Sequence, residues 1–306
     1  MDREPRTKPF VARTARSLVE RIRHGIVAPG QVGQHSGARL APGVQHCVEP
    51  QELTGVVLCK PAIFLVLEGQ KALHLPEQRF LAKAGDLLIV PAGRDVWVAK
   101  TPDSQTGSYL GLGVMFAPEL FAQLKQTFAA SLGAFSRTAR WQAPASDALL
   151  LCLGQWLEWC QHAQVPAQAQ QHRLVELLWL LANEGLAGNL LKTLNPSWRE
   201  RVAQVFTVDP SRDWRIQDLC HSLFVSESVL RRHLQAEGTS FRSVLEETRL
   251  MAGMLLLQET GDPINQVALA VGYQSQSRFA ERFKRRFGMT PGALRRTMDP
   301  VAARYA

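Results

Sequence analysis

The chain has 306 residues, a formal net charge of +8 and a pI near 9.6. Its length and its hydrophobic content of 46% suffice for two or three folding units, and its positive charge favours a polyanionic partner. It contains no run of about 18 uncharged apolar residues and no apolar signal core near Met1, so we expect a cytoplasmic protein without a membrane segment. The five cysteines form no Cys-x-x-Cys pair, which predicts reduced thiols rather than a disulfide framework or a zinc site.

Residues 1–40 are interpreted as a basic N-terminal arm. The arm is rich in Gly, Pro and Ser after Ile26, a composition that is typical of irregular chain. One short apolar pattern at Leu18, Val19 and Ile22 predicts one or two helical turns within it.

Residues 41–196 are predicted to form a unit that begins with strands. Short apolar or alternating runs fill the segment 56–98, separated by Gly or Pro, and residues 109–116 look like the last strand. This pattern predicts an all-β barrel or sandwich. If the unit holds a ligand pocket, the candidate lining residues are Phe64, Val66, Leu73, Ile89 and Trp97. Ordinary core packing is the simpler interpretation of most of them.

The pattern becomes helical after Pro118. Two strongly apolar stretches, 148–160 and 172–183, repeat at helical spacing and predict an antiparallel helical hairpin within about residues 118–190. Such a hairpin either covers the β unit or forms a dimer interface, and the pattern favours neither. Asn195-Pro196-Ser197 then marks the boundary to a last unit, residues 197–306.

The last unit contains two helix-turn-helix patterns, at 216–237 and 264–287, on either side of one apolar helix. In the first pattern, Ser226 is placed to cap the second helix through its hydroxyl. At about 100° per residue, one face of that helix is apolar and packs, while the other face is available to bases. The residues on the available face are Ser228, Arg231, Arg232 and Gln235.

The helix between the two patterns is predicted to run from Ser240 to about Gln258, a length of about 27 Å. Packed obliquely, it holds two reading helices near the roughly 34 Å spacing of successive major grooves. A second apolar stripe on this helix, formed by Leu250, Met254 and Leu257, either packs under the other helix-turn-helix or touches the β unit.

The second pattern predicts a more cationic reading helix. Gly272 allows its turn, Ser275 caps its second helix, and three phenylalanines share the packing face of that helix. The segment from Ser275 to Phe287 carries five basic residues and a single acid, Glu281. A merely solvated helix usually mixes the two signs, so this surface favours a DNA backbone partner.

Taken together, these residues resemble the DNA-binding domain of AraC/XylS-type transcription regulators over about residues 197–298. The matching positions in the first pattern are Asp218-Leu219, Ser226, Leu230, Arg232 and Gly238. Those in the second are Val267-Ala268, Gly272-Tyr273, Ser275, Phe279, Arg282-Phe283-Lys284, Gly288, Thr290-Pro291 and Arg295. Cys220 stands where the family usually has alanine, a small replacement that leaves the expected fold intact.

The resemblance implies roles for individual residues. In the first groove Ser228, Arg231 and Arg232 would face bases, and in the next groove Gln276, Ser277, Arg278 and Glu281 would do so. The residues expected to hold phosphates are Arg282, Lys284, Arg285 and Arg286. Glu281 has two open interpretations, acceptance from a cytosine amino group and an ion pair with Arg278 or Arg285.

The segment from Gly85 to Gly93 resembles the second cupin motif, with the spacing Gly-x5-Pro91-x-Gly. Cupin-like sensor domains commonly precede this type of DNA-binding domain. The metal-binding histidine expected soon after Gly93 is absent, and no His-x-His pair precedes the motif. We therefore predict residues 41–196 to be a cupin-like sensor and dimerisation domain without metal or cofactor, in an α+β protein of two domains.

These observations favour a bacterial transcription regulator, expected to be an activator, and they indicate no catalytic residues. The expected partners are double-stranded DNA, a second copy of the chain, RNA polymerase, and a small molecule or protein effector. Two alternatives remain open. One is a metal-dependent cupin enzyme with a DNA-binding appendage, and the other is a ligand-independent regulator whose N-terminal domain only dimerises.

Overall fold

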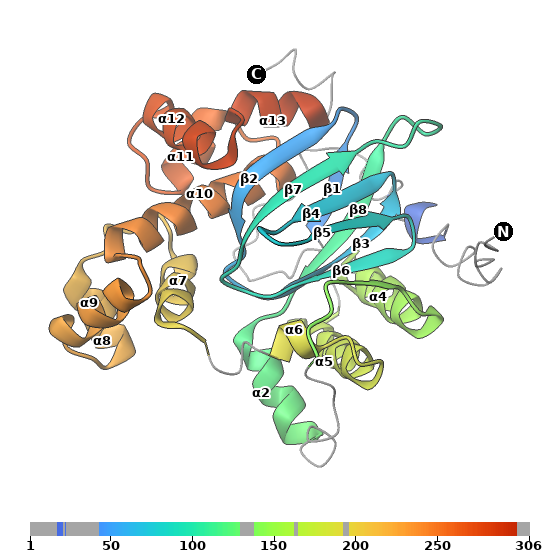
Figure 1. Cartoon of the computed structure of the whole chain (residues 1–306), viewed down its shortest axis with the longest axis horizontal. Helices are drawn as coiled ribbons and strands as arrows, with labels where there is room; N and C mark the ends of the chain where they lie inside the picture. Colours follow the sequence, from blue (N-terminus) through green and yellow to red (C-terminus); the bar gives the residue numbers. More distant parts are fainter. Residues whose placement is uncertain are drawn as a thin grey trace.

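A computed structural model describes residues 17–20, 22, 43–128, 138–161, 165–191 and 196–298. Apart from residues 17–20 and 22, the predicted basic arm lies outside the described residues. The described parts form a β-sandwich with helices on one side and a helical unit on the other, so the expected α+β fold with two domains is confirmed (Figure 1).

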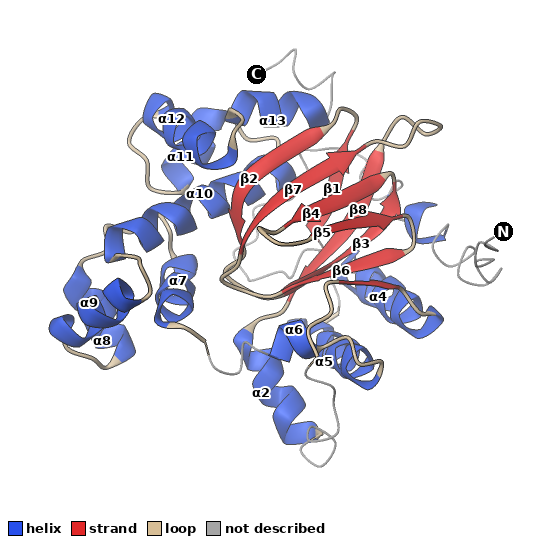
Figure 2. Ribbon diagram, viewed as in Figure 1, coloured by secondary structure: helices blue, strands red, loops and turns tan. Residues whose placement is uncertain are grey.

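The β-sandwich consists of antiparallel strands in two sheets. The strands are β1 (Gly43–Cys47), β2 (Gln51–Val57), β3 (Ala62–Glu68), β4 (Gln70–His74), β5 (Arg79–Lys83), β6 (Asp86–Val90), β7 (Asp95–Thr101), β8 (Tyr109–Met115) and β9 (Gln142–Pro144). Within the described chain, one sheet has the order β1-β8-β3-β6-β9 and the other the order β2-β7-β4-β5 (Figure 2). The space between the two sheets is the interior of the sandwich.

Side-chain alternation assigns each residue of a strand to one face of its sheet. In β7, Val96, Val98 and Lys100 are buried, whereas Asp95 and Trp97 between them are exposed. Strands β3 and β6 are buried on both faces, since helices cover the outer face of the five-stranded sheet. Their near-continuous apolar runs are typical of such doubly covered strands.

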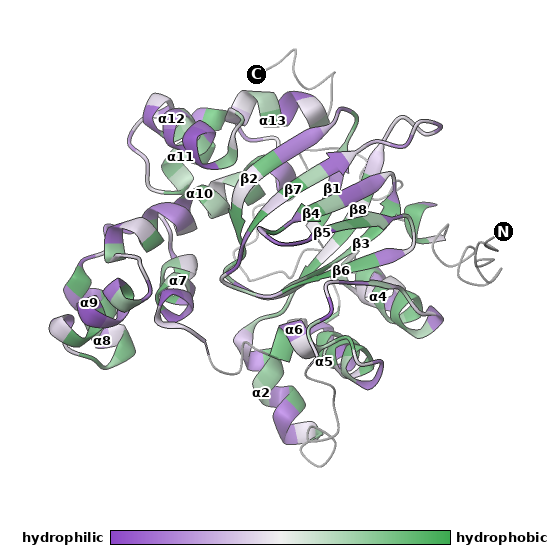
Figure 3. Ribbon diagram, in the orientation of Figure 1, coloured by the Kyte–Doolittle hydropathy of each residue, from purple (hydrophilic) through white to green (hydrophobic). Residues whose placement is uncertain are grey.

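Four helices pack on the five-stranded sheet: α2 (Pro118–Thr127), α4 (Asp147–Gln161), α5 (Ala167–Asn183) and α6 (Gly188–Leu191). Helices α4 and α5 occupy the two stretches predicted as a hairpin and are mostly hydrophobic (Figure 3). Their apolar faces join Ile63, Leu65 and other sheet residues in one core. Leu18 and Ile22 of the N-terminal arm are buried in the same core, so this part of the arm packs on the sensor unit.

The C-terminal unit contains α7 (Trp198–Val208), α8 (Ile216–Leu223), α9 (Glu227–Ala236), α10 (Phe241–Glu259), α11 (Ile264–Ala270), α12 (Gln276–Phe287) and α13 (Pro291–Met298). We call α7, α8, α9 and the start of α10 the first lobe, and the end of α10 with α11, α12 and α13 the second lobe. Helix α10 connects the two lobes (Figure 1). No helix in the described residues is long and apolar enough to cross a membrane.

The two lobes are attached to the β-sandwich in different ways. The first lobe has a core of its own around Phe206, Leu230 and Leu234. In the second lobe, by contrast, Phe279 and Phe283 belong to the same buried cluster as the sandwich interior. The second lobe and the sandwich therefore share one continuous core.

Candidate nucleic-acid interface

Helix α9 presents one polar, solvent-exposed face. The hydroxyl of Ser226 accepts a hydrogen bond from the amide of Val229, which fixes the start of the helix. Leu230 and Leu234 anchor the helix in the first lobe. All four residues predicted to face bases on this helix are exposed, namely Ser228, Arg231, Arg232 and Gln235.

The two arginines of this face differ in their surroundings. Arg231 forms an ion pair with Glu227 one turn earlier, with 2.7 Å between Nη2 and Oε1. Arg232 makes no ion pair within the described residues, so its guanidinium is free to approach a base edge without first losing a partner. This makes Arg232 the better base-reading candidate of the two.

Helix α12 has the same construction in the second lobe. The hydroxyl of Ser275 accepts from the amide of Arg278, and Gly288 ends the helix in the left-handed conformation at φ 82°. Phe279, Phe283 and Phe287 are fully buried and contact one another in sequence, with ring centroids 5.5 and 4.6 Å apart. The four predicted base-facing residues, Gln276, Ser277, Arg278 and Glu281, are all exposed. Within the described residues, Glu281 forms no ion pair with Arg278 or Arg285.

The basic end of α12 is engaged with acids of the same chain. Arg282 and Arg285 both reach Glu246 of α10, at 3.3 and 3.1 Å. Lys284 is exposed and has no ion-pair partner in the part of the chain that the structure describes. Two of the four residues predicted to hold phosphates thus share one carboxylate, and DNA would have to displace it.

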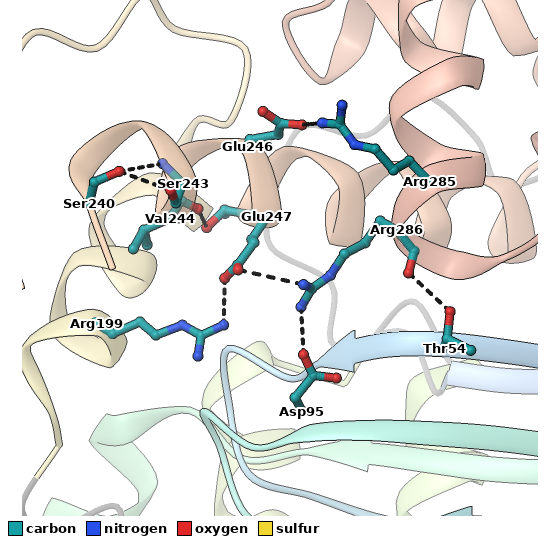
Figure 4. A network of polar contacts seen from close by, with 11 residues as sticks. Thr54, Asp95, Arg199, Ser240, Ser243, Val244, Glu246, Glu247, Arg285 and Arg286 are labelled. Atoms are coloured by element: carbon teal, nitrogen blue, oxygen red, sulfur yellow. Dashed lines mark hydrogen bonds and ion pairs between the residues drawn. The ribbon is translucent and has the colours of Figure 1, made fainter. Parts of the chain in front are cut away.

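Arg286, the fourth residue of that set, lies between the lobes and the sandwich (Figure 4). Its guanidinium is 3.2 Å from Asp95 of β7 and 3.7 Å from Glu247 of α10. Glu247 also pairs with Arg199 of α7, at 2.6 Å. The side chain of Arg286 is only 24% exposed, so its predicted phosphate contact requires it to leave this network.

The backbone of the second lobe is also tied to the sandwich. The hydroxyl of Thr54 in β2 donates to the carbonyl of Arg286, and the amide of Val48 donates to the carbonyl of Thr297 in α13 at 2.8 Å. Gly55 adopts φ 62°, and a Cβ atom there would lie 2.6 Å from the carbonyl oxygen of Arg286. The close approach of α12 to β2 therefore depends on a glycine at this position.

The cupin-like motif has a structural role in this chain. Strand β6 lies between Gly85 and Pro91, and Gly93 follows with φ 72°. A Cβ atom at Gly93 would lie 2.6 Å from Oε1 of Glu200, so the turn after β6 lies against a side chain of α7 in the first lobe. Within the described residues, no group of three or more His, Cys, Asp or Glu side chains could hold a metal ion.

The stripe of helix α10 whose partner the sequence left open lies in the core that the second lobe and the sandwich share, and Met254 of that stripe reaches the sandwich. Leu250, Met254 and Leu257 belong to the cluster that contains the sandwich interior. Met254, with Leu255 and Glu259, also lines a cavity of about 60 Å³ that lies between the two sheets and α10. Helix α10, which links α9 and α12, is thus one wall of this cavity.

The candidate pocket residues separate into two groups in the structure. Phe64 and Leu73 line this cavity. Ile89 faces the helices on the opposite side of its sheet, because its neighbours Leu88 and Val90 take the inner positions. Val66 is buried in the interior without lining the cavity, and Trp97 is 40% exposed and stacks on His74 at 4.5 Å. Of the five predicted pocket residues, Val66, Ile89 and Trp97 therefore do not line this cavity.

The sequence reasoning missed two cavity residues, Lys71 and Lys100. Both are buried lysines that line the cavity, on β4 and β7. Strand alternation was the available signal, since Lys71 shares its face with Leu73, and Lys100 shares its face with Val96 and Val98. The usual exposure of lysine conceals this pattern.

Burial raises the pKa of the cysteine thiols of residues 41–196. Burial raises the pKa of Cys47 to about 11 and that of Cys152 to about 12. Burial also raises the pKa of Cys160, to about 11. Such thiols carry little thiolate near neutral pH, and the five cysteines, all within the described residues, form no disulfide.

The arrangement of two capped, exposed helices joined by one linker, behind a β-sandwich with an internal cavity, defines a class of DNA-binding regulators. Residues 219–297 match the family model of a helix-turn-helix domain, and residues 44–186 match that of the AraC-type transcriptional regulator N-terminus. The chain therefore belongs to the AraC-type transcriptional regulators, as the resemblance of its motifs indicated.

Curated relatives share part of the chain. GadX, a transcriptional regulator of Escherichia coli, is 35% identical over 102 residues, which are 33% of this chain and 37% of GadX. The urease operon transcriptional activator of Escherichia coli is 29% identical over 139 residues, covering 44% of this chain and 46% of the relative. The matches thus span less than half the length of these relatives.

Solved structures show the same fold over most of the chain. Unliganded ToxT of Vibrio cholerae superposes with a TM-score of 0.63 at 14% identity, covering 84% of this chain and 96% of ToxT. Wild-type ToxT bound to an unsaturated fatty acid gives the same TM-score and identity, with 88% and 99% coverage.

Proposed function

We propose that this protein is a sequence-specific transcription regulator that inserts α9 and α12 into two successive major grooves of promoter DNA in the cytoplasm. The supporting observation is that both helices are capped by a serine, anchored by apolar residues and exposed on the opposite face. Helix α10 has 19 residues, or about 28 Å, which suits two reading helices on one side of a duplex.

In this proposal both helices contact bases, and the phosphate contacts come from α12. Arg232 and Arg278 are exposed and carry no ion pair within the described chain, so they read bases, together with the polar residues beside them. Lys284 and Arg285 are exposed on the cationic helix and bind phosphates. Arg282 and Arg286 join them once their acidic partners are released.

The N-terminal part supplies regulation and assembly in this proposal. We assign residues 1–40 to an arm, 41–196 to a sensor and dimerisation domain and 197–306 to the DNA-binding domain. The regulator acts as a homodimer and as an activator that contacts RNA polymerase. The fatty acid bound to ToxT supports a small-molecule effector for the sensor.

Binding to DNA from the region around the gene tests this function. Fluorescence anisotropy with the footprinted site and with random DNA is measured for the wild type, Arg232→Ala and Arg278→Ala. Loss of a bidentate base contact costs about 1–3 kcal/mol, or about 5- to 150-fold in affinity, on the footprinted site only. Arg79→Ala, at an exposed arginine of β5, is the control and should bind as the wild type does. Equal losses on both DNAs, or no footprint, would refute the assignment.

A further inference from the structure

The cavity between the sheets and α10 is apolar except for a few polar side chains. Its walls include Leu53, Val56, Phe64 and Val98 from the sandwich, and Met254 from α10. The polar side chains among its lining residues are Gln45, Lys71, Lys100, Gln258 and Glu259. An apolar cavity with a few convergent polar groups is the usual form of a small-molecule site.

The two lysines are the unusual feature of this cavity. Lys71 is 2% exposed and Lys100 is 3% exposed. The ammonium group of Lys71 donates to Oε1 of Gln45 at 2.7 Å and lies 3.6 Å from the centre of the Phe64 ring. Lys100 is paired with Lys71 across the two strands, lies 5.8 Å from the centre of the Tyr109 ring and is near the thiol of Cys47, and it has no hydrogen-bond acceptor in the described chain. Neither lysine pairs with a carboxylate of the described residues, Glu259 included.

Burying two positive charges side by side without an anion lowers the stability of the folded state. Their effect on each other is visible in the titration of Lys71, whose pKa is lowered well below its usual value by burial and by the charge of Lys100. Burial lowers the pKa of Lys100 to about 8. A negative group placed between them would relieve both penalties, since an opposite charge favours the protonated form.

We propose that this cavity binds an apolar molecule carrying one carboxylate, with the carboxylate between Lys71 and Lys100 and the apolar body directed toward Met254 and Leu255 of α10. The inference deepens the proposed function, because it names the chemical class of the effector. The charge of the lysines selects the acid, and the aliphatic and aromatic walls select an apolar body.

The same geometry connects the ligand to the DNA-binding domain. A cavity of about 60 Å³ is smaller than the roughly 150 Å³ that holds benzene in an engineered protein. The body of such a ligand must therefore displace side chains of the cavity wall, to which α10 contributes Met254 and Leu255. Because α10 joins the two reading helices, binding of the acid changes DNA affinity, and DNA changes the affinity for the acid by the same factor.

Calorimetry on the full chain tests the ligand class with two probes, octanoate and 4-methylbenzoate, each compared with its uncharged amide. We expect at least one acid to bind and its amide to bind at least tenfold more weakly. Equal binding of acid and amide, or no binding by either acid, overturns the proposal. This comparison uses the wild type alone, so it does not depend on the folding of any variant.

Substitution of the two buried lysines tests whether the acid binds in this cavity. Lys71→Met and Lys100→Met keep the length of the side chain without its charge, and each should weaken binding of the acid at least tenfold. Lys83→Met, at an exposed lysine of β5, is the matched control and should bind as the wild type does. Unchanged binding by both cavity variants overturns the assignment. DNA binding by the ligand-free wild type is measured in parallel: if DNA binds and the acids do not, only the ligand inference fails, whereas absence of DNA binding refutes the proposed function.

Discussion

The guanidinium of Arg286, at the end of the second reading helix, lies 3.2 Å from the carboxylate of Asp95 in the sensor sandwich. The contact joins residues 191 positions apart and lies beside the backbone hydrogen bond from Thr54 to the carbonyl of Arg286. The sensor thus holds a residue that we propose to bind phosphate. In the described conformation, a phosphate bound by Arg286 would have to displace the carboxylate of Asp95.

Asp95→Asn is expected to strengthen DNA binding modestly. Asp95 is 55% exposed, and an exposed ion pair is worth about 0.2–1 kcal/mol, which corresponds to a gain of roughly 1.4- to 5-fold in affinity for any sequence. Anisotropy with random DNA at low salt measures it. Glu52→Gln removes an equal charge at an exposed position of β2 without an ion pair in the described chain, and should gain less. Equal gains from both variants would mean that net charge, not the contact with Arg286, sets the effect.

Gly55→Ala is expected to detach the second lobe from the sandwich. The new Cβ would lie 2.6 Å from the carbonyl oxygen of Arg286, in addition to the strain of φ 62°. Gly107→Ala is the matched control, since it has φ 69° and open space around the added atom. Both variants should lower Tm, but only Gly55→Ala should raise hydrogen exchange in α12 and α13. Similar exchange in the two variants would show that backbone strain alone accounts for the loss.

Lys284→Gln is expected to weaken binding to all DNA sequences about equally. Lys284 is exposed and without an ion pair among the described residues, so its contact with a phosphate is lost without any compensating release. The slope of log K against log salt should fall by about 1. Titrations between low and moderate salt measure this slope, and Lys83→Gln on β5 should leave it unchanged. A loss confined to the footprinted site would instead make Lys284 a base-reading residue.

Much of the reading apparatus could be predicted from sequence because its determinants are local. Ser226 and Ser275 cap their helices, and the helical period separates buried Phe279 from exposed Arg278 without any knowledge of the rest of the fold. The family motifs lie within these same short segments. The prediction succeeded where each residue's environment is set within a few turns of chain.

The sensor cavity was harder to predict, since it depends on which face of each strand meets which neighbour. Ile89 and Leu88 are equally apolar, so their sequence does not show which face of the sheet each one occupies. Tertiary packing places Ile89 against the helices on the outer face and Leu88 in the interior of the sandwich. In β7, alternation places Trp97 outside and Lys100 inside, against the ordinary preferences of both residue types. The contact of Arg286 with Asp95 depends on tertiary docking and has no local signal at all.

The buried lysines also give the ligand-free protein a pH dependence. The pKa of Lys100 is about 8 in the folded state, against 10.5 for an unperturbed lysine. Between these values the unfolded chain binds more protons, so folded stability rises with pH across this window, and the cost of the buried charge is fully present below pH 8. Lys71 shifts in the same direction.

Urea unfolding of the wild type and Lys100→Met at pH 7 and pH 9.5 measures this effect. The advantage of Lys100→Met over the wild type should shrink by roughly 2 kcal/mol between the two pH values, since each pKa unit corresponds to about 1.36 kcal/mol. Titratable groups far from Lys100 cancel in this difference, whereas Cys47 and Lys71 interact with Lys100 and contribute to the measured change. The difference between the wild type and Lys83→Met should stay constant with pH. A pH-independent difference for Lys100→Met would mean that Lys100 titrates normally, and that the cavity does not hold a destabilised cation for an acid to neutralise.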